Sequence, residues 1–89
     1  MKIKTGMVMT EVGGDYVAVP TGATAREFRG IVRLNDTGAE IWKGIEAGLT
    51  IDQIADKLVA EYDGLDKEHA LRSVNTLVDS LRTDGLIVE

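Results

Sequence analysis

The stretch GIVRLNDTG, residues 30–38, changes from the pattern of a strand to that of a helix within nine residues. Alternate residues of a strand point to opposite faces, so Ile31 and Arg33 share one face. Val32 and Leu34 share the other, and this alternation predicts a short strand over residues 30–34. The chain before this point has the patterns of strands and the chain after it those of helices, which together predict an α+β fold.

The second half of the stretch predicts a helix start. Asn35, Asp36 and Thr37 have side chains that accept hydrogen bonds from the free amides of a first helical turn. Thr37, with Glu40 three residues later, also fits a capping box. We expect this helix to cover about residues 38–47.

Two further strands are expected before this stretch. Residues 7–12 and 16–19 both alternate, and the two glycines between them supply the positive φ angles of a hairpin turn. Pro20 ends the second strand because its nitrogen has no hydrogen to donate. A loop with a short helical turn over residues 23–28 then leads to the third strand.

Two more helices follow the first. Thr50 with Gln53 fits a second capping box, and Asp66 is placed to cap the last helix. A turn at residues 62–65 joins them as a helix-turn-helix pair, and with the hairpin this predicts a winged helix-turn-helix. The expected order is a three-stranded antiparallel sheet followed by three helices. The apolar tail, residues 86–88, either adds a strand or closes the core.

Size and composition indicate one domain spanning residues 1–89, with 44% hydrophobic and 28% charged residues. The net charge of −5 argues against a nucleic acid or an anionic membrane as partner, since both require a basic surface. The chain contains no cysteine, and no apolar run approaches the roughly 20 residues of a membrane span. We therefore expect a cytoplasmic protein.

No group of residues predicts catalysis. The single histidine, His69, falls in the first turn of the last helix, where a lone imidazole is usually solvated. Asp52 and Asp56 lie one turn apart on a polar helix face, where both carboxylates are simply solvated. The glycines match no phosphate-binding motif, and Trp42 falls on the inner stripe of its helix. We expect no enzyme activity, cofactor or metal site.

The helix-turn-helix pair raises the alternative of DNA binding. A recognition helix presents Arg, Lys, Asn or Gln to bases and phosphates. The last helix offers Arg72, Asn75 and Arg82, but Asp66 and Glu68 occupy the end that would enter the groove. The surrounding negative charge disfavours DNA, and a winged-helix DNA-binding domain remains the second hypothesis.

The third strand suggests peptide capture instead. In a simple meander this strand lies at the sheet edge with free N–H and C=O groups, to which an extended peptide can add as a further strand. Arg29 and Arg33 place two guanidiniums there, suited to the carboxylates of an acidic peptide. The same charges are equally explained as protection against edge-to-edge aggregation. A third hypothesis is a dimerisation module whose free strand pairs with its own copy.

The last helix is compatible with a groove beside this strand. Its apolar stripe is flanked by His69, Ser73, Thr76 and Ser80, and three of these four side chains are small. An extended chain can therefore approach closely between this helix and the strand. A merely solvated flank explains the same residues equally well.

Taken together, the runs VPTGATAREFRGIVRLNDTGAEIWKGIEAG and LTIDQIADKLVAEYDG resemble the PqqD family, small proteins related to the chaperone of pyrroloquinoline quinone biosynthesis. The residues that carry the resemblance are Val19, Pro20, Phe28, Gly30, Leu34, Asn35, Thr37, Gly38, Trp42, Thr50, Glu61, Tyr62, Asp63, Leu81, Gly85 and Leu86. The match covers about residues 6–88, and the loop over residues 64–66 departs modestly from the pattern, with Gly64 between Asp63 and the helix cap.

This resemblance implies a recognition element for ribosomally synthesised, post-translationally modified peptides (RiPPs). Such a domain binds the leader of a precursor peptide as an extra strand on residues 29–34, against a helical wall at residues 72–80. It presents the precursor to a separate modifying enzyme, in the PqqD case a radical SAM enzyme, and we expect a monomer or weak homodimer. The expected peptide-binding residues are Arg29, Gly30, Ile31, Val32, Arg33, Leu34, His69, Arg72, Ser73, Thr76, Leu77 and Ser80.

Overall fold

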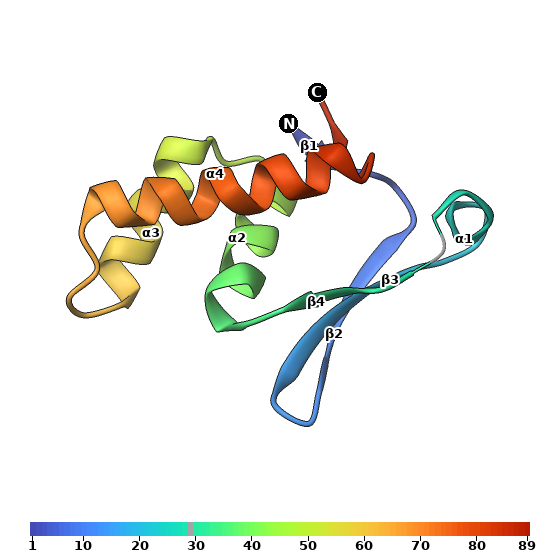
Figure 1. Ribbon diagram of the computed structural model, residues 1–89, viewed down its shortest axis with the longest axis horizontal. Helices are drawn as coiled ribbons and strands as arrows, with labels where there is room; N and C mark the ends of the chain where they lie inside the picture. Colours follow the sequence, from blue (N-terminus) through green and yellow to red (C-terminus); the bar gives the residue numbers. More distant parts are fainter. Residues whose placement is uncertain (29) are drawn as a thin grey trace.

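The computed structural model describes residues 1–28 and 30–89, and it contains the expected three-stranded antiparallel sheet (Figure 1). The strands β2 (Met7–Val12), β3 (Asp15–Pro20) and β4 (Val32–Leu34) lie in the order β2-β3-β4. The hairpin and the third strand are thus confirmed, although β4 begins two residues later than predicted. This order leaves β4 at one edge of the sheet.

Three helices follow the sheet, as predicted. They are α2 (Asp36–Glu46), α3 (Ile51–Glu61) and α4 (Lys67–Thr83), and a short α1 (Thr24–Glu27) lies between β3 and β4. Figure 1 shows α2, α3 and α4 gathered on one side of the sheet, with α4 the longest. The α+β class is confirmed, whereas the winged-helix classification of this arrangement stays a prediction.

The cap of α2 differs from the predicted Thr37–Glu40 capping box. The N-cap is Asn35, whose Oδ1 accepts a hydrogen bond from the Gly38 amide at 2.7 Å. Because β4 continues to Leu34, the extended residue that must cap the helix is the next one in the chain. Thr37 consequently lies inside the first turn, and the capping-box prediction was wrong.

The two later helix starts agree with the sequence. Thr50 and Gln53 form the reciprocal capping box at the start of α3. The Asp66 carboxylate accepts a hydrogen bond from the His69 amide at the start of α4. Such caps satisfy amides that have no partner within the helix, so they fix where each helix begins.

The helices enclose one apolar core with the inner face of the sheet. Trp42 of α2 is the largest of its fully buried side chains and lies on the predicted inner stripe. Ala18 and Leu34 contribute from the sheet. From α3 and α4 the core receives Ile54, Leu58, Val74, Val78 and Leu81. The core therefore fixes α4 and β4 relative to each other through α2.

A second, two-stranded sheet joins the two ends of the described chain. β1 (Lys2–Ile3) pairs antiparallel with β5 (Ile87–Val88), and Figure 1 shows the chain ends side by side. The apolar tail thus adds a strand, one of the two predicted possibilities. Its partner was not predicted, because a two-residue strand has no measurable alternation.

Candidate functional site

A groove of about 630 Å³ lies between β4 and α4. Arg33 and Leu34 border it on the sheet side, and α4 borders it between residues 72 and 80. The start of α2 closes the space between these walls, with Ile41 on its buried side. None of the residues lining the groove belongs to β2 or β3, so the groove lies on the side of β4 away from the rest of the sheet.

The hydrogen-bond pattern of the sheet follows from its hairpin turn. Gly13 (φ 58°) and Gly14 (φ 90°) form the two-residue turn between β2 and β3. The residues that flank such a turn, Val12 and Asp15, form a hydrogen-bonded pair, and bonded and non-bonded pairs alternate along an antiparallel ladder. Odd-numbered residues of β3 therefore direct their N–H and C=O groups toward β2, and even-numbered residues direct theirs toward β4.

This alternation assigns the backbone of β4. The even-numbered Tyr16 and Ala18 lie opposite Leu34 and Val32, which therefore bond to β3. Arg33, between them, directs its N–H and C=O groups away from the sheet. No other strand of the described residues pairs with this edge, so the backbone groups of Arg33 are available to an added strand.

The bottom of the groove is apolar. Leu34 and Ile41 are only 6% and 2% exposed, and the half-buried Leu77 packs against the same core. The predicted small polar residues Ser73, Thr76 and Ser80 line the helical wall, and their short side chains leave room for an extended chain against α4. An aliphatic side chain that enters the groove would therefore lose contact with water on several sides.

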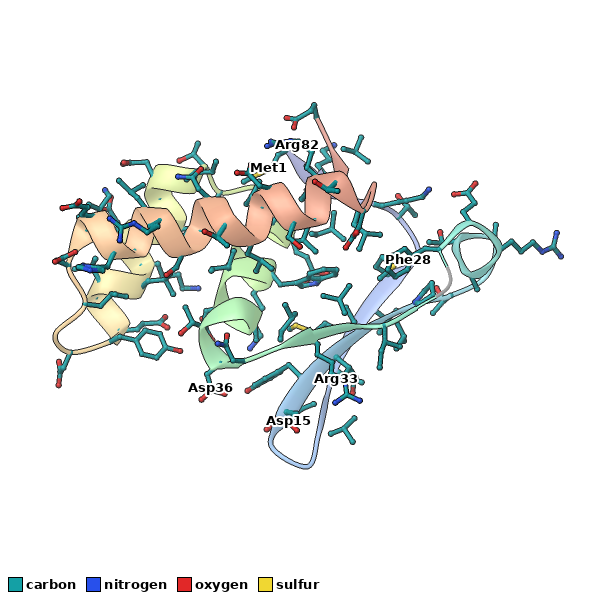
Figure 2. All side chains as sticks on the ribbon, viewed as in Figure 1. Met1, Asp15, Phe28, Arg33, Asp36 and Arg82 are labelled. Carbon is teal, nitrogen blue, oxygen red and sulfur yellow. The ribbon has the colours of Figure 1, made fainter. Side chains whose placement is uncertain are left out.

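The charged residues that line the groove are both arginines. Arg33 borders it from the strand and Arg72 from the helix, and no carboxylate belongs to the described lining. Figure 2 shows the Arg33 side chain on the side of β4 turned away from the helices. Arg72 has one loose ion pair, with Glu68 one helical turn earlier at 3.5 Å. The site thus offers backbone groups, an apolar floor and two cations.

Comparison with known proteins places the chain in a family. Its sequence matches the family described as Coenzyme PQQ synthesis protein D (PqqD) over residues 7–87. The chain belongs to the PqqD family. The matched region includes β2, β3 and β4 and all four helices, so the groove lies wholly within it. A search of curated proteins found no match.

Two solved structures share the fold of this PqqD-family chain. One, described as TbiB1 in complex with the TbiA(beta) leader peptide, is 23% identical with a TM-score of 0.76, over 97% of this chain and 93% of that chain. The other, lasso peptide synthetase B1 complexed with the leader peptide, is 22% identical with a TM-score of 0.78, over 99% and 96%. At this identity the likeness establishes the fold.

The structure brings most of the predicted site residues together. Seven of them line the groove: Arg33, Leu34, Arg72, Ser73, Thr76, Leu77 and Ser80. Ile31 is 52% exposed just before β4, whereas Val32 is partly buried and packs against the core. Gly30 is exposed beside Ile31, and Arg29 lies outside the described residues.

His69 does not line the groove of this PqqD-family chain. Its ring Nδ1 lies 2.8 Å from the Asp66 carboxylate, and its amide donates to the same oxygen. The hydrogen bond from this amide, followed by that from the ring, holds the pKa of the Asp66 carboxyl below its usual value. The residue is therefore part of the capped first turn of α4.

Four lining residues were not predicted as site residues. Asn35, Thr37, Gly38 and Ile41 all belong to the N-cap or first turns of α2. The sequence contained a signal for them, because a helix that starts directly after an edge strand must place its first turn beside that edge.

Neither a metal site nor a membrane helix is found in the described part of the chain. Residues 1–28 and 30–89 contain no group of three His, Cys, Asp or Glu side chains arranged to hold a metal ion. No helix formed by these residues has both the length and the apolar character needed to cross a bilayer.

Proposed function

We propose that this chain binds the leader of a ribosomally made precursor peptide as an additional strand on β4. The proposal depends on the backbone of Arg33. Its N–H and C=O groups point outward from the unpaired edge of β4, next to the groove that α4 borders on the other side. Ile31, two residues earlier, directs its backbone groups the same way by alternation. Main-chain hydrogen bonds would supply affinity, and the groove would select side chains.

The comparisons support this proposal. The sequence belongs to the PqqD family, and the two solved structures compared above are described as complexes with a leader peptide. The present chain has the features such a complex needs: a free edge strand, a facing helix and a groove between them.

In this proposal the chain is a non-enzymatic, cytoplasmic carrier that works without a cofactor. It holds the precursor by its leader and presents the remainder to a separate modifying enzyme, for which the PqqD resemblance favours a radical SAM enzyme. A monomer or weak homodimer suits this role, because each β4 edge has to stay open for a peptide.

An NMR titration of isotopically labelled protein tests the proposal. Leader peptides of precursors encoded near this gene are added to the full chain, with duplex DNA as the comparison ligand. We expect shift changes concentrated on Ile31–Leu34 and on the groove face of α4, with no response to DNA. Shift changes on α4 with DNA alone would favour the DNA-binding hypothesis, and a peptide response confined to other surfaces would refute strand addition on β4.

A further inference from the structure

An arginine borders the groove on each side, in a chain that is otherwise acidic. The protein has 15 Asp and Glu against 10 Lys and Arg, yet the two charged residues lining the groove are Arg33 and Arg72. An acidic peptide is repelled by the net charge at long range, but this repulsion is screened beyond about 8 Å at physiological salt. Pairs at hydrogen-bond distance lie well inside this screening length, so the two arginines decide which charge a bound peptide carries beside them.

Neither arginine is strongly engaged within the chain. Arg72 and Glu68 are separated by 3.5 Å and their side chains are 67% and 80% exposed, which makes a weak ion pair. Arg33 has no carboxylate within 4.0 Å among the described residues. Both guanidiniums can therefore pair with carboxylates of a ligand without breaking a strong internal contact.

The geometry limits how many peptide residues interact. From residue 72 to residue 80, α4 rises by about 12 Å, at about 1.5 Å per residue. An extended peptide covers that length with about four residues, at about 3.3 Å each. Successive residues would alternate between the groove floor and the outer face of the sheet.

The two faces of an added strand meet different chemistry. Inward-facing side chains reach the apolar floor of Leu34, Ile41 and Leu77. The residue opposite Arg33 faces outward with it, because directly opposed residues share a face. An aliphatic residue is thus favoured inward, and a carboxylate is favoured at the neighbouring outward position.

We propose that the groove selects a leader segment in which an acidic residue directly adjoins an aliphatic one. In that segment the carboxylate pairs with Arg33 on the outer face, and the aliphatic side chain enters the floor between β4 and α4. A second acidic residue toward the Arg72 end strengthens binding. This inference rests on the proposed function and names the class of peptide that the site accepts.

Selection from a displayed library of random peptides separates this inference from the proposed function. The full wild-type chain is the bait. An enriched motif with Asp or Glu next to Leu, Ile, Val or Met supports the inference. An enriched motif that is neutral or basic overturns it but leaves peptide binding intact. Failure to enrich any peptide refutes both.

A charge-swap experiment then tests the role of Arg33. Synthetic peptide carrying the enriched motif is titrated against Arg33→Glu and against Arg26→Glu, which makes the same change in net charge on the exposed surface of α1. We expect about tenfold weaker binding for the first variant and a change within about twofold for the second, as for a close pair against a screened one. Replacing the peptide acid by Lys should restore binding to Arg33→Glu. Equal losses in both variants, or no restoration, would overturn the pairing.

Discussion

Replacing Ile31 with proline tests the assignment of the free edge. The alternation set by the hairpin turns the N–H of Ile31 away from β3, toward the position of an added strand. Proline removes that donor without removing a hydrogen bond within the sheet. Glu11→Pro is the matched control, because Glu11 is exposed on the opposite edge strand β2 and its N–H also points away from β3. Both substitutions fall at edges, where proline is tolerated.

The size of the effect follows from the loss of one main-chain hydrogen bond. Such a bond contributes about 0.5–1.5 kcal/mol net, so Ile31→Pro should weaken leader binding by about two- to twelvefold. Glu11→Pro should leave the affinity unchanged within error, because β2 lies on the far side of β3.

Isothermal titration calorimetry of one leader peptide against wild type, Ile31→Pro and Glu11→Pro measures the three dissociation constants. Urea unfolding of each variant shows that both are folded at the temperature of the titration. Equal affinities for wild type and Ile31→Pro, with both folded, would show that the peptide does not bond to this edge. A loss in Glu11→Pro as large as that in Ile31→Pro would point to β2 as the docking strand.

Further predictions concern stability. Gly44→Ala should lower the free energy of unfolding, measured in urea, by about 1 kcal/mol. The added Cβ would lie 2.8 Å from Cγ1 of the buried Ile54, and this overpacking exceeds the gain in helix propensity. A more stable variant would show that Ile54 moves aside. Asn35→Ala should cost about 1 kcal/mol by removing the cap of α2, and an unchanged unfolding curve would contradict that cap. The folded-state pKa of Asp66 is lowered from 3.8, so its ionised form stabilises the fold above that pH and the contribution is lost as the pH falls through the folded-state value. Wild type should therefore exceed Asp66→Asn in stability near neutral pH and converge with it in acid, whereas a constant difference would rule out the charge as the cause.

Local patterns predicted the elements and the position of the edge. The two adjacent glycines determine the hairpin because few other residues adopt positive φ, and the caps at Thr50 and Asp66 are formed by residues close in sequence. The free edge of the third strand follows from the simple order of the meander. Each of these features is decided within a few residues, so the sequence alone carries it.

Features that depend on distant residues were predicted less well. The cap of α2 is Asn35 and not the predicted Thr37–Glu40 capping box, because pairing with β3 sets the end of β4. Strand pairing is not visible in a local sequence pattern. β1 forms because β5 arrives beside it from the other end of the chain. The contribution of Ile41 to the groove likewise depends on how α2 packs below α4.

The two explanations of the edge arginine are compatible in this structure. If two β4 edges paired with each other antiparallel, both Arg33 side chains would lie on the same face of the joint sheet and repel each other. An acidic peptide in the same place would instead bring a carboxylate to that face. The Arg33 side chain therefore disfavours pairing between two β4 edges and favours an acidic ligand, while the backbone groups of β4 remain open to an added strand.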